Sequence, residues 1–347
     1  MPDVLPITVV IPAYNAAATL GAALASIAAG RCVPERTIVV DDGSTDATVR
    51  IARAFETRVI SQRNGGLADA RNAGIRAATT PWIALLDADD VWTPGRLAEQ
   101  WALHERSPGE SLVTSDYAYL VGDRITEPAV MPTFAQYRAM VRTPLDALGV
   151  RVARADMLAA ILTGNFVLPS SMLVARRLFT DFDAFYTERE RLPSGPEFFI
   201  GEDYEWLLRV LRHTDVLVVE RPLVHYRRSA SSLSADGGRL RYGDVVLGEL
   251  VRASPHRYAV GADRAFERMW PYQLAHAAAR YLAAGDVVRA DAMLVRGGSS
   301  GDVRARVLGA VTAPFARTSI GRHAFAGAFR LWRTVVRPAL ASVRSRR

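Results

Sequence analysis

Carboxylates follow two apolar runs near the start of the sequence. Asp41 and Asp42 come directly after one run, and Asp87 and Asp89 follow another. Two neighbouring carboxylates can hold one divalent cation, and Mg²⁺ or Mn²⁺ held in this way takes substrate phosphates as further ligands. Residues i and i+2 of a strand share a face, so Asp87 and Asp89 are expected to converge on one ligand. An isolated D-x-D is weak evidence, because aspartate is also common in turns.

Other phosphate and metal motifs are absent from the sequence. The first apolar run continues into Pro12-Ala13-Tyr14-Asn15 instead of a G-x-G-x-x-G segment, and no G-x4-G-K-[ST] segment occurs. This disfavours a dinucleotide fold and a P-loop. The single cysteine excludes a disulfide framework and a thiolate zinc site, and the six histidines show no metal-binding spacing.

Alternating strand and helix patterns must position the acidic residues. We predict strands over 7–11, 37–40, 58–60 and 82–86, and helices over 17–29, 47–55 and 67–78. Repeated β-α-β units with short links predict an α/β fold with a parallel sheet and helices on both faces. Ligands of such sheets bind beyond the carboxyl ends of the strands, which is where the carboxylates fall. Further along, the pattern is mixed, with strands predicted over 112–117 and 171–175.

The charge of the chain is unevenly distributed. The net charge is +7 over 347 residues, and all 43 basic residues are arginine. Residues 1–238 hold 24 arginines against 29 acidic residues, whereas residues 239–347 hold 19 against 7. The pattern also changes to helix after Gly237-Gly238, so we predict a helical, arginine-rich region over 239–347 that follows a domain over 1–235. The acidic first part argues against nucleic acid as a partner.

Five motifs occur in order along the predicted domain. They are VIPAYN (10–15), DDGSTD (41–46), NGGLADARNAG (64–74), LDADD (86–90) and GEDYEWLLR (201–209). Over roughly residues 5–235 the sequence resembles the inverting GT-A glycosyltransferases of family 2. The resemblance implies a Rossmann-like, mainly parallel sheet flanked by helices. It also implies a nucleotide-sugar-binding half over 1–120 and an acceptor half over 121–235.

The resemblance implies donor-binding roles for five residues. Tyr14 would stack on the nucleotide base, and Asp42 would contact the base or ribose. Pro12 would fix the turn that lets the base approach the backbone. Arg71 would help to position the nucleotide, and Asp87 would touch the ribose and a metal ion.

The resemblance also implies a divalent metal, Mn²⁺ or Mg²⁺, and a general base. Asp89 would be the direct metal ligand, with Asp87 as a second ligand. Asp203 would deprotonate the acceptor hydroxyl, and Glu202 and Trp206 are expected on the acceptor side. The metal would neutralise the leaving diphosphate while a carboxylate activates the attacking oxygen, so one displacement inverts the anomeric centre.

Structural interpretations of the same residues remain open. Asp42 and Asp46, with the neighbouring Asp41, are also typical of an Asx turn and a helix cap. Arg71 is compatible with a helix-surface ion pair. Asp203 is compatible with a first-turn acid that the helix dipole favours, and Trp206 with a core position.

One segment departs from the family pattern. Ser229 stands where the family often has a histidine, and His225 is expected to be structural. Arg227 and Arg228 are therefore expected to contact the diphosphate, because a guanidinium matches phosphate oxygens in a bidentate way. The sequence has neither the Q-x-x-R-W segment nor the transmembrane helices of the processive members, so we predict transfer of a single sugar.

The arginine-rich tail carries an apolar stripe in helical register, formed by Phe325, Phe329, Trp332, Val336, Leu340 and Val343. Two interpretations are open: a helix that docks on the catalytic domain, and an interfacial helix on anionic lipid. Nucleic-acid binding is the least favoured. Pro2 and Asp3 follow Met1 in place of the basic segment that begins a signal peptide, so we predict a cytoplasmic protein. The second interpretation of the tail would give it a peripheral location on the inner membrane face.

These features together predict a metal-dependent, inverting glycosyltransferase. It would move one sugar from a nucleotide-diphospho-sugar to a saccharide, lipid-linked or other hydroxyl acceptor, in polysaccharide, glycolipid or other glycoconjugate biosynthesis. One alternative is a sugar nucleotidyltransferase, which typically has a glycine-rich basic loop after its first strand, unlike residues 12–15. The other is a non-catalytic nucleotide-sugar-binding protein, against which intact Asp87, Asp89 and Asp203 argue.

Overall fold

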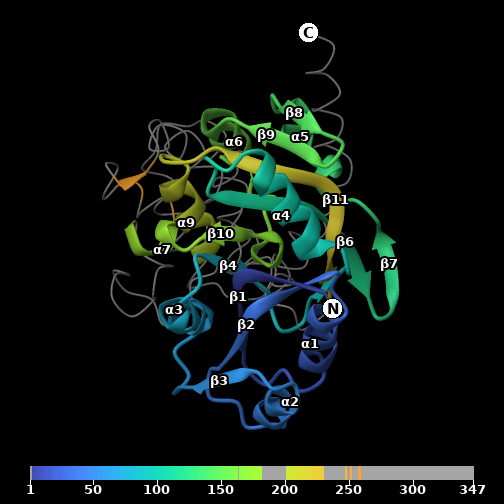
Figure 1. Ribbon diagram of the computed structural model, residues 1–347, viewed down its shortest axis with the longest axis vertical. Helices are drawn as coiled ribbons and strands as arrows, with labels where there is room; N and C mark the ends of the chain where they lie inside the picture. Colours follow the sequence, from blue (N-terminus) through green and yellow to red (C-terminus); the bar gives the residue numbers. More distant parts are fainter. Residues whose placement is uncertain are drawn as a thin grey trace, which may run out of the picture. The chain divides into compact units, whose positions relative to one another are not determined.

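The computed structural model describes residues 2–162, 164–181 and 201–229, together with Leu247, Val251, Arg257 and Tyr258 (Figure 1). Apart from these four positions, the expectations for residues 239–347 lie outside the described residues. Nearly all described residues belong to one compact unit, and the description below concerns that unit. Within the described residues, no helix has the length and apolar character needed to cross a membrane.

Strands and helices alternate in the first part of the chain. They are β1 (Asp3–Ala13), α1 (Leu20–Ala28), β2 (Cys32–Asp41), α2 (Thr48–Ala54), β3 (Arg58–Ser61), α3 (Leu67–Ala77) and β4 (Trp82–Leu85). These elements match the predicted ones in type and order, and differ mainly in the earlier starts of β1 and β2. The predicted α/β class is therefore confirmed.

The first four strands pair in parallel in the order β3-β2-β1-β4. Their β-branched runs, such as Val9 to Ile11 and Ile38 to Val40, have no exposed surface. Helices cover both faces, because right-handed crossovers place α3 on the face opposite α1 and α2 (Figure 1). Parallel strands end at the same edge of the sheet, so the loops after β1, β2 and β4 meet there.

The second part of the chain extends the sheet with mixed pairing. It contains β5 (Val91–Trp92), α4 (Arg96–Arg106), β6 (Leu112–Val121), β7 (Arg124–Glu127), η1 (Met131–Thr133), α5 (Ala135–Ala139), β8 (Thr143–Asp146), β9 (Gly149–Val152), α6 (Arg154–Ile161), η2 (Pro169–Ser171), β10 (Leu173–Ala175), α7 (Arg177–Asp181), α9 (Glu202–Val210) and β11 (Val216–Arg227). β10 lies antiparallel between β4 and β6, whereas β11 runs parallel to β6. The main order is β3-β2-β1-β4-β10-β6-β11-β9-β8, and outside it β5 pairs with β11 and β7 pairs with β6.

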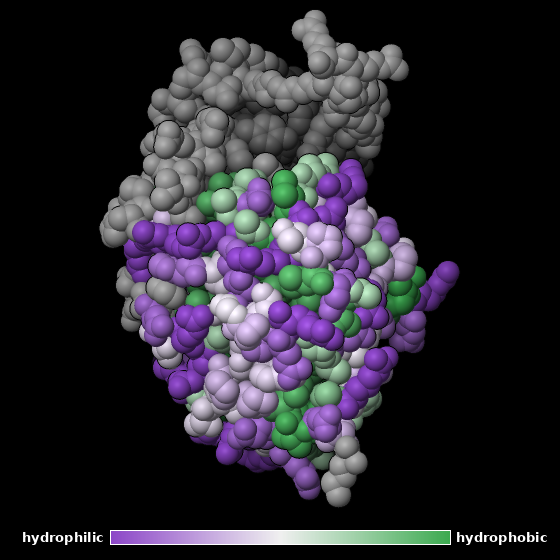
Figure 2. Space-filling view, turned by 45° about the horizontal axis from the view of Figure 1, so that its top comes forward, coloured by the Kyte–Doolittle hydropathy of each residue, from purple (hydrophilic) through white to green (hydrophobic). Residues whose placement is uncertain are grey.

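The outer surface is mixed in character. Figure 2 shows polar residues over much of the described part of one face, with apolar residues in small, separate groups. Scattered apolar side chains of this kind are normal on protein surfaces.

The segment from Asp87 to Asp89 differs from the prediction in one respect. β4 ends at Leu85, and Asp90 N donates to Asp87 O at 3.1 Å, which closes a turn directly after the strand. The expectation that both carboxylates share a strand face is therefore wrong. In this turn Asp87 and Asp89 are partly exposed, while Ala88 between them is buried.

Gly74 lets α3 approach the sheet closely. A Cβ at this position would lie 2.4 Å from Val10 Cγ1 and 3.1 Å from Val40 Cγ2. Because protein interiors are close-packed, such an atom would push the helix away from β1 and β2. The same helix carries Arg71 one turn earlier.

Replacing Gly74 tests this close approach. We expect Gly74→Ala to lower the free energy of unfolding by about 1–3 kcal/mol, because the added methyl overpacks the helix–sheet contact. The measurement is urea denaturation followed by circular dichroism. Gly21→Ala in α1 is the matched control: its nearest neighbour is Ile51 Cγ2 at 3.9 Å, and it should gain about 0.5–1 kcal/mol. An equal change in the free energy of unfolding for Gly74→Ala and Gly21→Ala would contradict the packing argument.

Candidate active site

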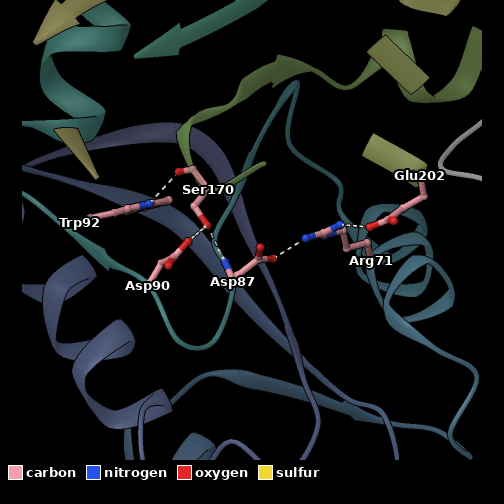
Figure 3. Close-up of polar contacts among 6 residues, drawn as sticks. All are labelled: Arg71, Asp87, Asp90, Trp92, Ser170 and Glu202. Carbon is pink, nitrogen blue, oxygen red and sulfur yellow. Dashed lines mark hydrogen bonds and ion pairs between the residues drawn. The ribbon is translucent and has the colours of Figure 1, made fainter. Parts of the chain in front are cut away.

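Arg71 of α3 connects two acidic residues from distant parts of the chain (Figure 3). Its Nη2 donates to Asp87 Oδ1 at 2.5 Å, and its Nη1 donates to Glu202 Oε1. Asp87 lies in the turn after β4, and Glu202 begins α9, 131 residues beyond Arg71. The Arg71 side chain is only 2% exposed. One guanidinium therefore joins three elements in the interior.

The charge of Arg71 is stabilised by its acidic partners. Burial works to lower the pKa of Arg71, but the carboxylates of Asp87 and Glu202 outweigh this and raise it above its ordinary value. The guanidinium is buried rather than on the helix surface, so the surface ion-pair interpretation of Arg71 is wrong.

Asp203 follows Glu202 in the first turn of α9 and is partly exposed. Burial raises the pKa of Asp203 to about 7, and the negative charge of Glu202 acts in the same direction. A carboxylate that titrates near neutral pH suits a general base, because it is ionised and still basic at the working pH. Asp203 is also one of the acidic residues in the first turn of α9, so its general-base role stays a prediction.

The turn after β4 presents two carboxylates with the chemistry of a cation site. Burial, together with the charge of Asp87, raises the pKa of Asp89 to about 6. One carboxylate oxygen of Asp87 accepts a hydrogen bond from Arg71. Among the described residues, no three His, Cys, Asp or Glu side chains form a complete metal centre. Two carboxylates completed by substrate phosphates are an arrangement that Mg²⁺ and Mn²⁺ use, so the donor set fits such an ion.

The loops after β1 and β2 lie together at the same edge of the sheet. Asn15 N donates to Ser44 Oγ at 2.9 Å, and Thr45 N donates to Asn15 Oδ1 at 2.8 Å. Tyr14, which lies between the end of β1 and Asn15, is 54% exposed. Pro12, within β1, is buried. The structure therefore leaves the Tyr14 ring accessible at the carboxyl edge.

Asp42 holds the glycine turn that leads into α3. Its Oδ1 accepts hydrogen bonds from Gln62 Nε2 and Gly65 N, both at 2.8 Å, and its Oδ2 accepts one from Gly66 N at 2.9 Å. Gly66 has a φ of 96°, a conformation that favours glycine. Asp42 thus lies at the predicted edge and also fixes the start of the helix that carries Arg71.

The neighbouring aspartates, Asp41 and Asp46, accept hydrogen bonds from backbone N–H groups at this edge of the sheet. Asp41 Oδ1 accepts a hydrogen bond from Ser44 N at 3.0 Å. Asp46 Oδ1 accepts one from Thr48 N at 2.9 Å at the start of α2, and hydrogen bonding to Thr48 lowers the pKa of Asp46. The turn interpretation agrees with the structure for Asp41. Asp46 precedes the N-cap of α2, Ala47, and links the start of this helix to the loop after β1, because its Oδ2 accepts a hydrogen bond from Ala17 N at 3.0 Å.

The two arginines predicted to contact the diphosphate have different surroundings. Arg227 donates from Nε to Asp89 O at 2.9 Å and from Nη1 to Gly122 O at 3.1 Å. Arg228 is exposed, with its guanidinium 4.8 Å from the centre of the Tyr119 ring. Arg227 therefore supports the turn that contains Asp89, and Arg228 has the more accessible guanidinium.

The residues expected on the acceptor side are in the interior. Trp206 has no exposed surface and stacks on Phe179, with ring centroids 4.7 Å apart. It is a core residue, so the expectation that it lies on the acceptor side is wrong. Glu202 is 4% exposed and is paired with Arg71. Its carboxylate ties the first turn of α9 to Arg71.

Ser170, which contacts the turn, and Asp90, which ends it, were not among the site residues predicted from the sequence. Ser170 Oγ accepts a hydrogen bond from Asp87 N at 3.0 Å and donates one to Asp90 Oδ2 at 2.6 Å (Figure 3). Nothing in the sequence singles out Ser170, which lies 80 residues after Asp90. Asp90 belongs to the LDADD motif, and this membership is the sequence feature that could have pointed to a role for it.

Comparison with known proteins identifies related chains. The family model described as Glycosyl transferase family 2 matches residues 8–150. Rv0539, an uncharacterized glycosyltransferase of Mycobacterium tuberculosis, is 35% identical over 156 residues, which cover 44% of this chain and 69% of the relative. The succinoglycan biosynthesis protein ExoO of Rhizobium meliloti is 46% identical over 101 residues, which cover only 28% of each protein.

The fold also has a counterpart among solved structures. The crystal structure of S. aureus TarS 1–349 matches with a TM-score of 0.55 at 16% identity, covering 88% of each chain. A mainly parallel sheet, flanked by helices and carrying an acidic turn at its carboxyl edge, defines the class as a GT-A glycosyltransferase fold. The chain belongs to glycosyltransferase family 2, in agreement with the prediction from the five motifs.

Replacing Arg71 tests its buried ion pairs. We expect Arg71→Ala to lower the free energy of unfolding by about 3–5 kcal/mol, because it removes the positive charge from beside a buried carboxylate. Arg142→Ala is the control, since Arg142 pairs with Glu220 at 2.6 Å where both side chains are substantially exposed. Losing this surface pair should cost less than about 1 kcal/mol in the same urea titration. Similar losses for the two variants would contradict a special role for Arg71.

Proposed function

We propose that the chain is a metal-dependent, inverting glycosyltransferase that transfers one sugar from a nucleotide-diphospho-sugar to a hydroxyl acceptor. The observation that carries the proposal is the bridge made by Arg71. It holds the turn of Asp87 and Asp89 beside Glu202, and therefore beside Asp203. The guanidinium of Arg71 thus connects the turn of Asp87 and Asp89, which suits the donor phosphates, with the start of α9, where Asp203 suits the acceptor hydroxyl.

The loops after β1 and β2 support a nucleotide donor. The exposed ring of Tyr14 is available to stack on a base, and its location beside the loop of Ser44 places it at the carboxyl edge of the sheet. Among the described residues, Asp42 Oδ2 accepts one hydrogen bond, from Gly66 N, and an oxygen of this kind can accept a second one, which we assign to the base or ribose. TarS has been solved in complex with UDP-GlcNAc, a donor of the class that we propose.

The diphosphate would be bound at the turn after β4. Asp89 and Asp87 would hold Mn²⁺ or Mg²⁺, which when bound neutralises charge on the leaving diphosphate. Arg71 orients Asp87 by binding one of its oxygens. Arg228 is the arginine that we assign to the diphosphate, because Arg227 is engaged by the carbonyls of Asp89 and Gly122.

Asp203 would act on the acceptor. Its carboxylate would take the proton of the acceptor hydroxyl as that oxygen forms a bond to the anomeric carbon. The bond between this carbon and the diphosphate oxygen breaks at the same time, and the diphosphate leaves with the electron pair. Attack from the face opposite the leaving group inverts the anomeric centre in one step, so no covalent sugar intermediate is needed.

The acceptor class rests on the relatives. ExoO is named for succinoglycan biosynthesis, and we propose that this chain likewise serves glycoconjugate biosynthesis. The sequence lacks the Q-x-x-R-W segment of processive members, which supports the transfer of a single sugar to each acceptor.

Asp203→Asn tests the general base. We expect this variant to lower kcat by about 10²–10⁴-fold, because an amide cannot accept the hydroxyl proton. Binding of the nucleoside diphosphate, measured by calorimetry, should stay unchanged. Asp156→Asn is the matched control, since Asp156 is a first-turn acid of α6. If Asp203 served only the helix dipole, both variants would retain activity.

The pH dependence of the wild-type chain provides a second measurement of the same role. Because Asp203 must be deprotonated to accept a proton and its pKa is raised to about 7, kcat/KM should rise with pH and level off above about 7. The residual activity of Asp203→Asn should lack this rise. A wild-type profile that is flat through neutral pH would argue against Asp203 as the base.

Asp89→Ala tests the cation site. Mn²⁺ should strengthen the binding of a nucleoside diphosphate to the wild-type chain, and we expect this gain to disappear in the variant. Calorimetric titrations of UDP, GDP and dTDP, with and without Mn²⁺, measure it. The wild-type gain should also weaken below about pH 6, where Asp89 becomes protonated. Asp3→Ala, at the opposite end of β1, is the control, and an unchanged gain in Asp89→Ala would exclude Asp89 as a ligand.

A further inference from the structure

The turn from Asp87 to Asp90 is held from one side by a single hydroxyl group. Ser170 Oγ accepts a hydrogen bond from Asp87 N at 3.0 Å and donates one to Asp90 Oδ2 at 2.6 Å (Figure 3). Ser170 and Asp90 both have no exposed surface, so water does not compete for these bonds. The backbone of one proposed cation ligand and the end of the turn are thus tied to the same atom.

Ser170 is itself anchored to a rigid part of the fold. It belongs to η2, and side chains from β5 and α4 bind carbonyl groups of η2 and of Met172, the residue after it. Trp92 Nε1 donates to Ser170 O at 3.0 Å, Arg96 Nη2 donates to Met172 O at 2.8 Å, and Gln100 Nε2 donates to Ser171 O at 2.8 Å. These donors fix η2 and therefore the direction of the Ser170 hydroxyl.

The other side of the turn is held by β11. Arg227 N donates to Asp90 Oδ1 at 3.0 Å, and Arg227 Nε donates to Asp89 O at 2.9 Å. The two oxygens of Asp90 thus bind η2 on one side and β11 on the other. The carboxylates of Asp87 and Asp89 are not used for these bonds.

We propose that Ser170 and Asp90 are positioning residues that hold the turn in the shape in which Asp87 and Asp89 can face one cation. The inference rests on the proposed function, which places that cation at Asp87 and Asp89. Two like charges in a short turn repel each other, so without these bonds the backbone would relax and separate them. Groups that orient metal ligands in this way usually change metal affinity when they are removed.

Ser171 provides a matched control one residue along the chain. It also has no exposed surface, and its Oγ makes two hydrogen bonds, one to Leu168 O at 2.7 Å and one with Thr114 Oγ1 at 2.7 Å. Neither partner belongs to the turn. Ser170→Ala and Ser171→Ala therefore remove the same atom and the same number of buried bonds from the same element, but only Ser170→Ala releases the turn.

The test is the gain in affinity for a nucleoside diphosphate that Mn²⁺ confers on the full chain. Titrations use whichever of UDP, GDP or dTDP the wild-type chain binds. We expect Ser170→Ala to reduce this gain by about 10–100-fold and Ser171→Ala to retain it. Both variants should lower the melting temperature, because each loses two buried hydrogen bonds. Asp90→Ala, which removes both carboxylate oxygens, should reduce the gain in the same direction as Ser170→Ala, and it serves as the second variant if Ser170→Ala does not fold.

The outcomes separate this inference from the proposed function. If the wild-type chain shows no Mn²⁺-dependent gain, the cation site itself is overturned, and the inference with it. If the wild-type chain shows the gain and Ser170→Ala or Asp90→Ala retains it as fully as Ser171→Ala does, the inference alone is overturned. A loss of affinity that is equal with and without Mn²⁺ would mean a general structural role, and it would also overturn the inference.

Discussion

The buried guanidinium of Arg71 is the constraint on which the candidate site depends. The Arg71 side chain is only 2% exposed. A positive charge at such a position needs acidic partners, because removing it from water is costly. Asp87 and Glu202 must therefore come to Arg71, which brings the turn after β4 and the start of α9 together. Gly74 allows α3 to pack closely enough on β1 and β2 for this meeting to occur.

The carboxylates around this cation have separate environments and separate tasks. Glu202 forms an ion pair with Arg71, and Asp90 forms hydrogen bonds with η2 and β11. Asp89 and Asp203 are partly exposed, and burial raises their pKa values to about 6 and about 7. Groups of the same chemical type thus become candidates for ligand, base or support according to what surrounds them.

The first half of the fold was predictable from local patterns. Runs such as Ile7 to Ile11 are β-branched and apolar because helices cover both sides of the strand, and this leaves a clear signal in the sequence. The strand predicted over 171–175 is observed as the short β10 (Leu173–Ala175), but no local pattern encodes its antiparallel place between β4 and β6, which depends on long-range pairing. The shared strand face expected for Asp87 and Asp89 was wrong because a turn bond ends the strand before them.

The sequence by itself determined the order of the motifs, the α/β class, the family, and which residue types were available for metal, base and nucleotide chemistry. Only the tertiary structure decided which of them meet: that Glu202 pairs with Arg71, that Trp206 is in the core, and that Ser170 supports the turn. The physical reason is distance along the chain. Local patterns encode strands, helices and turns, whereas an ion pair across 131 residues exists only after the sheet and its helices have packed.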